Sequence, residues 1–290
     1  MNKETLHQHY TAAGLTTYAE KIGKYLRHAI TITTECRDDI ALGASKFGGT
    51  PDLPPDWSWP TRKDRKSGQE RSLDFVAQIN FAESKAYDVE GELPAHGILY
   101  LFYDLDAQPW GFDPAERDGY HVAYYDGDIA QLQPRPAPQN CNHDYALGTA
   151  RLHYGSRLES PNPYGFLITT AGLDEEEDET YTDAYNALQD EYALSHKLLG
   201  HSENIQGDME LECQLVTNGL YCGDPSGYED PRAAALIAGA ADWVLLLQID
   251  SDEDNCGMMW GDSGRIYLWI RREDLQARRF AQAHLILQCY

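Results

Sequence analysis

Two segments of the chain follow nearly the same sequence template. The first is an apolar run at residues 74–80 that ends in Gln-Ile-Asn and is followed, after a polar loop, by Gly97 and an apolar-aromatic run. The second, at residues 244–250, ends in Gln-Ile-Asp and is followed by Gly264 and a similar run. The loops differ in length while the apolar runs keep their pattern, as expected for a diverged internal duplication. Such a duplication constrains the architecture strongly but says little about chemistry.

The repeat extends weakly toward the N-terminal side of each copy. Residues 46–49 read Lys-Phe-Gly-Gly, residues 197–200 read Lys-Leu-Leu-Gly, and each set precedes one of the Gln-Ile runs. Two such halves can share one sheet system and one hydrophobic core around an approximate twofold axis. We therefore expect a single α+β domain over residues 1–290, with largely antiparallel sheets built from two diverged β-rich halves and N-terminal helices packed on the sheet.

The expected domain has four consecutive parts: N-terminal helices at 1–30, a first half at 31–135, a connector with an acidic run at 136–195, and a second half at 196–290. The helical prediction depends on Leu15, Tyr18, Ile22 and Leu26, which recur at helical spacing after a break at Gly14. Local patterns also predict a first strand starting at 29–34, a hairpin that pairs 120–125 with 128–133, a helix at 182–199 and a closing strand at 284–290.

The charge balance limits the kind of partner. The chain has 47 acidic and 23 basic residues and a formal net charge of −24. An acidic surface repels phosphate backbones, so we expect no nucleic-acid partner. The same charge permits simple solubility, metal binding or docking on a basic protein. A solvated acidic surface is the simplest of these interpretations.

Cysteine spacing and apolar runs indicate a cytoplasmic protein without a membrane anchor. The six cysteines form no C-x-x-C pair, and the polar N-terminus differs from the apolar core of a signal peptide. Reduced cytosolic thiols are therefore expected. The longest apolar-rich run, at 233–249, is interrupted by Asp242 and is too short to cross a bilayer.

An ordered series of motifs along residues 40–290 resembles one known family. The motifs are 46–51 (KFGGTP), 59–60 (WP), 77–80 (AQIN), Leu93-Pro94 ahead of Gly97, 198–200 (LLG), 205–209 (IQGDM), 246–252 (LLQIDSD) and 259–264 (MWGDSG). In this order they resemble the YwqG-like family, a group of bacterial proteins assigned to domain of unknown function 1963. The resemblance implies a single mixed α/β unit with largely antiparallel sheet. It implies no established activity and no assigned catalytic residues.

Acidic residues after the second Gln-Ile run are candidates for a metal site. Asp250, Asp252 and Asp262 could offer hard oxygen ligands to Ca²⁺ or Mg²⁺. An EF-hand register starting at Asp250 requires Gly and Glu where the chain has Asn255 and Gly261, so that motif fails. A polar loop after a buried strand is the simpler interpretation, and we favour it. No other cofactor is expected.

Six residues are candidates for a ligand site near the symmetry axis: Lys46, Gly49, Gln78, Asn80, Gln248 and Trp260. A glutamine at the end of an apolar strand is costly to bury unless both ends of its amide are hydrogen-bonded. The two glutamines therefore either tie down loop backbone across the approximate twofold axis, which we favour, or face one cleft and bind a ligand. The loop at Gly49, with Lys46 as counter-charge, could approach a phosphate or carboxylate, although it lacks P-loop spacing.

The sequence as a whole favours a non-enzymatic binding protein, for example an acidic inhibitor or an immunity-type partner of a basic protein. The reasons are the charge of −24 and the lack of a complete catalytic signature. The alternatives are a metal-assisted hydrolase and a small-ligand enzyme or sensor with a site between the two halves.

Overall fold

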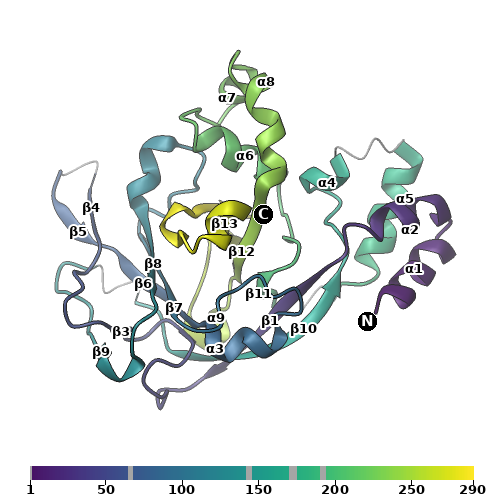
Figure 1. Cartoon of the computed structure of the whole chain (residues 1–290). Coiled ribbons are helices and arrows are strands. Elements are labelled where there is room, and N and C mark those ends of the chain that lie inside the picture. Colours follow the sequence, from purple (N-terminus) through teal and green to yellow (C-terminus); the bar gives the residue numbers. More distant parts are fainter. Residues whose placement is uncertain (1, 65–67, 142–145, 170–174, 190–193) are drawn as a thin grey trace.

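One large antiparallel sheet organises the molecule. The computed structural model describes residues 2–64, 68–141, 146–169, 175–189 and 194–290 (Figure 1). Ten strands form the sheet in the order β14-β13-β12-β11-β1-β10-β2-β6-β7-β8, and all neighbours are antiparallel. Their bounds are β1 Arg27–Cys36, β2 Lys46–Phe47, β6 Asp74–Asn80, β7 Ile98–Tyr103, β8 Tyr120–Tyr125, β10 Ala150–Glu159, β11 His196–Leu199, β12 Trp243–Asp250, β13 Arg265–Arg271 and β14 His284–Gln288. The predicted mixed fold with a large antiparallel sheet is confirmed.

Short helices and ribbons surround the sheet. The helices are α1 Lys3–Ala12, α2 Thr16–Ile22, α3 Phe81–Ser84, α4 Phe166–Thr169, α5 Glu175–Asn186, α6 Met209–Val216, α7 Ser226–Glu229, α8 Ala233–Leu236, α9 Glu253–Cys256 and α10 Arg272–Gln276. The 3₁₀ segments are η1 Lys85–Tyr87, η2 Pro114–Gly119, η3 Ile129–Gln131, η5 Ile237–Asp242 and η6 Phe280–Gln282. Two small ribbons pair β3 Asp52–Leu53 with β9 Gln133–Pro134, and β4 Thr61–Lys63 with β5 Glu70–Ser72. Among the described residues, no helix is both long and apolar enough to cross a bilayer.

The sheet curls until it is nearly a barrel, which brings its two edges into contact (Figure 1). The hydroxyl of Tyr120 on β8 lies 3.0 Å from Nδ1 of His284 on β14. The segment between β7 and β8 also meets β14, where the backbone N–H of Leu287 donates to the Trp110 carbonyl at 2.9 Å. Gly111 allows this approach, because it has φ +95° and a Cβ there would lie 2.1 Å from the Leu285 carbonyl oxygen. Only glycine fits both conditions.

The sheet is buried on both faces along most of its length. One face forms the main core, with Ile79, Leu101, Leu247 and Leu268 all at most 1% exposed. On the opposite face, a loop carrying Trp57 and Trp59 covers the first half, and α6 covers the second half. Burial on both faces explains why β6 and β12 are continuous apolar runs instead of alternating ones.

The N-terminal helices pack against α5 and reach the sheet at one strand. Leu6, Leu15 and Ile22 are buried in a cluster that includes Leu158 of β10. The ring of Tyr10 stacks on the ring of Tyr181 in α5, with 5.3 Å between centroids. The predicted helices with a break at Gly14 are confirmed, and β1 begins at Arg27 as part of the sheet.

The expected connector at 136–195 is wrong, because it contains a central strand. β10 pairs with β1 over ten residues and occupies the middle of the sheet. Its sequence is rich in Arg, His and Tyr and includes Gly155, so it lacks the apolar alternation that predicts strands. Pairing with β1 fixes it in place. The acidic run at the start of α5 lies partly outside the described residues.

Two other predicted elements differ from the structure. The expected hairpin is wrong because Asp128 caps η3, with its carboxylate accepting from Ala130 N–H at 2.9 Å, and β9 pairs with β3 instead of β8. The expected helix at 182–199 ends at Asn186, and His196–Leu199 form β11. Partners on both sides, β1 and β12, decide the strand conformation there.

Candidate functional site

The same lysine–glutamine pairing occurs in both halves of the sheet. Lys46 on β2 lies opposite Gln78 on β6, and Lys197 on β11 lies opposite Gln248 on β12. A register shift also occurs at the same place in both halves. It lies between Phe75 and Ala77 where β6 pairs with β7, and between Leu245 and Leu247 where β12 pairs with β13. The backbone turns after each lysine strand through two residues with positive φ, Gly48 and Gly49 in one half and Leu199 and Gly200 in the other.

Each glutamine holds the loop that follows its lysine. The Oε1 atom of Gln78 accepts from Asp52 N–H at 2.8 Å, and that of Gln248 accepts from Glu203 N–H at 2.9 Å. Asp52 and Glu203 lie at the same separation in sequence from their lysines. The Nε2 atoms donate to the carbonyls of Ala44 and Ser195, at 2.9 and 2.7 Å. Both amides are thus satisfied at both ends, which offsets the cost of burying them.

A lysine and a tyrosine complete each copy of this arrangement. The ammonium groups of Lys46 and Lys197 pair with Asp52 and Glu203, at 2.9 and 2.8 Å. The hydroxyl of Tyr100 donates to the Asp52 carbonyl at 2.6 Å, and that of Tyr267 donates to the Glu203 carbonyl at 2.7 Å. We call each set of Lys, Gln, Tyr and acidic residue a loop clamp.

The first loop clamp is closed. The side chains of Lys46 and Asp52 are only 7% and 4% exposed. Trp57 packs edge-on against the tyrosine of this clamp, with its ring centroid 5.6 Å from that of Tyr100. The Nε2 atom of Gln78 also donates to the Asp52 carboxylate at 3.0 Å. The groups of the first clamp are therefore paired with one another and sealed from solvent.

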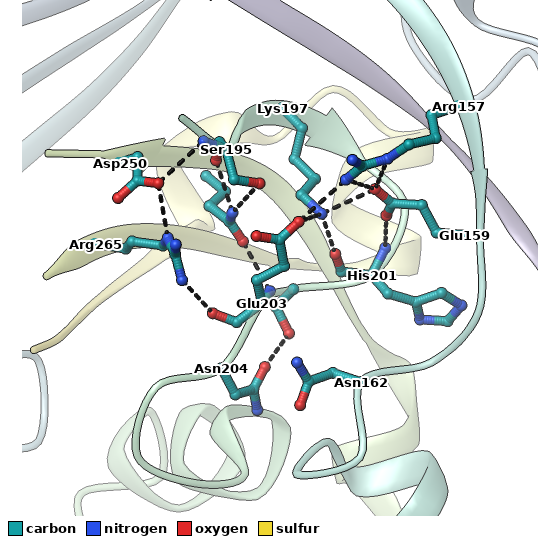
Figure 2. Close-up of polar contacts among 12 residues, drawn as sticks. Arg157, Glu159, Asn162, Ser195, Lys197, His201, Glu203, Asn204, Asp250 and Arg265 are labelled. Atoms are coloured by element: carbon teal, nitrogen blue, oxygen red, sulfur yellow. Dashed lines mark hydrogen bonds and ion pairs between the residues drawn. The ribbon is translucent and has the colours of Figure 1, made fainter. Parts of the chain in front are cut away.

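The second loop clamp borders an open cavity of about 490 Å³, which we call the Glu203 cavity. Figure 2 shows the polar side chains around it, including Arg157, Glu203 and Arg265. Side chains of this wall remain accessible, since Glu203 is 16% and Arg157 44% exposed. The remaining wall residues come from α5, from the loop after β10 and from the segments beside β11 and β14: Asn162, Pro163, Tyr164, Tyr185, Asn186, Gln189, Leu194, Ser195, Asn204 and Tyr290.

Ion pairs stabilise the floor of the cavity. The ammonium of Lys197 lies 2.9 Å from Glu159 and 2.8 Å from Glu203, and it donates to the His201 carbonyl at 3.0 Å. Arg157 lies 2.7 Å from Glu159 and 3.1 Å from Glu203. The guanidinium of Arg265 contacts Asp250 at 3.0 Å, as the left side of Figure 2 shows.

These contacts fix the charges of the floor. Burial acts to raise the pKa of the Glu203 carboxyl, but Lys197 and Arg265 outweigh burial and lower that pKa to about 2. Burial acts to lower the pKa of Arg265, but Asp250 raises it above its ordinary value. Burial and the charge of Arg27 lower the pKa of His201 to about 3, so its imidazole is neutral. The floor carries three cations and three anions that compensate one another.

Several residues predicted as ligand groups have structural partners. Lys46 and Gln78 belong to the closed clamp. The side chain of Asn80 donates to the Gly43 carbonyl at 2.9 Å and accepts from Ala82 N–H at 3.0 Å. Gly49 turns the chain with φ +67°, where a Cβ would lie 2.1 Å from the Thr149 hydroxyl. These contacts occupy the polar atoms, while a ligand role for the same residues stays a prediction.

Gln248 and Trp260, both predicted as ligand groups in the second half, lie in different surroundings. Gln248 holds the Glu203 loop and so supports the cavity from beneath. Trp260 is fully buried in the main core, where its indole N–H donates to the Asp250 carbonyl at 3.1 Å. The two glutamines tie down loop backbone, as expected, but each does so within its own half and not across the approximate twofold axis.

The three carboxylates predicted as metal ligands have different surroundings. Asp250 pairs with Arg265, and Asp262 is exposed. Asp252 accepts from Thr34 at 2.6 Å and from Asn255 at 2.8 Å. Burial acts to raise its pKa, but the interaction with His196 at 3.5 Å and the hydrogen bonds from Thr34 and Asn255 lower the pKa to about 2. Within the described ranges, no group of three His, Cys, Asp or Glu side chains is arranged to hold a metal. Metal binding stays a prediction.

Sequence reasoning missed the residues that form the floor and walls, above all Arg157, Glu159, Glu203 and Arg265. One available signal was the equal spacing from Lys46 to Asp52 and from Lys197 to Glu203. Arg157 and Glu159 had no such signal, because they lie on β10, in the segment expected to be a connector.

Comparison with known proteins identifies a family whose function is not assigned. No curated protein matches this chain in sequence. A family model described as "Domain of unknown function (DUF1963)" matches residues 45–289, which include both loop clamps and all ten strands of the sheet except β1. The chain therefore belongs to the DUF1963 family of domains of unknown function.

Proposed function

We propose that this protein binds a small polar ligand without net charge in the Glu203 cavity. The observation that carries the proposal is the ring of exposed apolar side chains around a polar floor. Tyr164, Leu194 and Tyr290 are 53%, 45% and 78% exposed, and all three line this cavity. Large apolar side chains that stay exposed around a concave polar surface are typical of ligand sites.

The chemistry of the walls favours a ligand rich in hydroxyl or amide groups. In the described part of the chain, the side-chain amides of Asn186 and Gln189 make no hydrogen bond, and both line the cavity. The charged groups of the floor already compensate one another, so little net field remains to select an ion. Tyrosine rings can cover the apolar face of such a ligand while the amides bind its polar groups.

The state of the thiols and imidazoles supports binding without catalysis. Burial raises the pKa of Cys141 to about 11 and those of Cys222 and Cys256 to about 12, so these thiols stay protonated. Burial lowers the pKa of His284 to about 4, and its two nitrogens contact Tyr120 and Gly111. Groups held in this way are poor nucleophiles and bases at neutral pH.

The two halves are proposed to be copies of one ancestral unit. The recurrence of Lys, Gln, Tyr and the acidic residue in the same hydrogen-bonding roles supports this origin. In this view the first clamp has kept only the structural role, since its lysine and aspartate are buried. The second clamp has Glu203 where the first has the shorter Asp52, and it borders an open cavity. The proposed ligand site therefore exists in the second half alone.

Binding can be tested with a panel of uncharged polyols, sugars and amides, monitored by thermal shift and then by calorimetry. We expect at least one compound to raise the melting temperature of the wild-type chain. Tyr164→Ala and Asn186→Ala should each weaken its binding at least about tenfold. Tyr221→Ala is a matched control, because Tyr221 is 42% exposed and does not line the cavity. Equal binding by all variants would rule out this cavity.

A basic protein is the second candidate partner. The net charge of −24 supports it, and so does the position of acidic helix α5, which contributes Tyr185 and Asn186 to the cavity wall. A complex of this kind should form faster and more tightly at low salt. Replacing the exposed Asp178 and Glu179 by Asn and Gln should slow its association with a captured basic partner. Salt-independent binding would argue against this candidate.

A further inference from the structure

A second cavity, of about 380 Å³, lies between η2 and the end of β13. Both halves of the sheet contribute to its wall, since Arg117 comes from the β7–β8 connection and Arg271 from β13. We propose that this cavity, which we call the Arg117 cavity, binds a phosphate group of a small ligand between the guanidinium groups of Arg117 and Arg271.

Each guanidinium group lies over an aromatic ring, which orients the group without neutralising it. The Arg117 guanidinium is 4.3 Å from the centre of the Tyr120 ring, and that of Arg271 is 4.8 Å from the Trp243 ring. Arg117 also donates to the Ala281 carbonyl at 2.8 Å and, at 3.4 Å, to the carbonyls of Tyr120 and Ala283. Arg271 donates to the Thr217 hydroxyl at 3.5 Å. A guanidinium stacked in this way keeps N–H groups along its edge for a planar or tetrahedral oxyanion.

Neither arginine forms an ion pair with a carboxylate in the part of the chain that the structure describes. Most other arginines in the described ranges do so at short distances, as in Arg62 with Asp104 at 2.8 Å and Arg151 with Glu83 at 2.7 Å. Acidic residues outnumber basic ones by 47 to 23, so partners are plentiful. Two arginines that line one cavity and lack such a partner indicate a place reserved for an external anion.

Other charged groups of the wall leave this positive character in place. Asp274 is paired with Arg279 at 2.6 Å. Asp113 also lines the wall, where its carboxylate accepts from Ala115 N–H at 2.8 Å at the start of η2, and the two arginines outnumber it. His284 contributes a neutral imidazole whose nitrogens contact Tyr120 and Gly111. The Arg117 cavity thus differs from the Glu203 cavity, where every cation of the floor has an anionic partner.

Phosphate is favoured over a single carboxylate because two guanidinium groups can each form two parallel hydrogen bonds with its oxygens. The probe is inorganic phosphate, titrated into the full chain by calorimetry at constant ionic strength set with chloride. We expect saturable binding that Arg117→Gln and Arg271→Gln each weaken at least about tenfold. Arg232→Gln is the matched control, since it removes the same charge from an exposed arginine paired with Asp230.

Two controls distinguish a folding defect from a binding defect. The first is the melting temperature of each variant without phosphate. The second is Arg271→Lys, which keeps the positive charge but loses the paired N–H groups of the guanidinium. Reduced phosphate affinity in Arg271→Lys, with an unchanged melting temperature, would support the site. Glycerol 3-phosphate as a second probe tells a phosphate ester from free phosphate, and tighter binding of either supports the site. Equal affinity in wild type, Arg117→Gln and Arg271→Gln, or equal loss in Arg232→Gln, would overturn the proposal.

Discussion

Lys197 Nζ lies 2.8 Å from Oε1 of Glu203, and this pair supports the floor of the Glu203 cavity. The side chain of Lys197 is almost completely buried, so water cannot replace its partners. The pair holds the loop after β11 on one side, and Gln248 holds the backbone of the same loop on the other. The shape of the cavity therefore depends on a buried charge.

Lys197→Met should destabilise the protein strongly. Methionine fills a similar volume but leaves the half-exposed Arg157 as the cation shared by Glu159 and Glu203. Breaking a buried pair on one side costs about 3 kcal/mol or more, because the remaining charge is no longer fully compensated. Urea unfolding measures the loss. Arg232→Met, at an exposed pair, should leave the midpoint unchanged, and an equally small effect of Lys197→Met would contradict the role assigned to this lysine.

Stability should fall with acidification below about pH 5. Above that pH, Glu210 and Glu212 oppose the loss, because burial raises their pKa values to about 8 and the folded state takes up their protons first. The lowered pKa values of His201 and His284, about 3 and about 4, mean that the unfolded chain takes up protons first, from about pH 6.5 downward. Glu203, with a folded pKa of about 2, adds a stabilisation that is complete above about pH 4.5 and is lost as the pH falls toward 2.

The Glu203 contribution amounts to about 3 kcal/mol at neutral pH, because its pKa is lowered from 4.5 to about 2. Unfolding free energies measured between pH 5 and pH 3 should therefore decrease. In Glu203→Gln the decrease between pH 5 and pH 3 should be smaller than in the wild type. The same slope in both proteins would show that Glu203 is not the group responsible.

Gly111→Ala should loosen the contact between the two edges of the sheet. The new methyl group would require positive φ from alanine and would also collide with the Leu285 carbonyl. Gly14→Ala separates these effects, because Gly14 has φ +91° but no atom lies within 4 Å of where its Cβ would be. Unfolding by urea should show a loss of about 1 kcal/mol for Gly14→Ala and a clearly larger loss for Gly111→Ala. An equal loss of unfolding free energy in both variants would mean that the contact between the sheet edges rearranges at little energetic cost.

Millimolar Mg²⁺ or Ca²⁺ should leave the melting temperature unchanged. The carboxylate of Asp250 is engaged by Arg265, and that of Asp252 accepts from Thr34 and Asn255. A metal would have to displace these partners before it gained its own ligands. Thermal shift with and without a chelator is the measurement. A rise in melting temperature that Asp252→Asn abolishes would instead support the metal hypothesis.

The sequence alone was sufficient to predict the strands with the strongest patterns. β6 and β12 are continuous apolar runs of strand length, and such runs are buried in almost any compact fold. The buried glutamines could be predicted to hold loop backbone, because an amide in an apolar strand needs partners at both ends. The N-terminal helices were predicted from their spacing of apolar residues.

Tertiary contacts decided the rest. β10 and β11 have weak local patterns and become strands because neighbours on both sides supply hydrogen bonds. The Glu203 cavity combines Arg157, Tyr185, Glu203 and Arg265 from distant parts of the chain, and no spacing along the sequence records that proximity. The sequence by itself determined which residues must be buried and satisfied, since burial and hydrogen bonding follow from residue type. Only the curled sheet decided which of the two loop clamps is sealed and which is open, because that depends on what packs over each one.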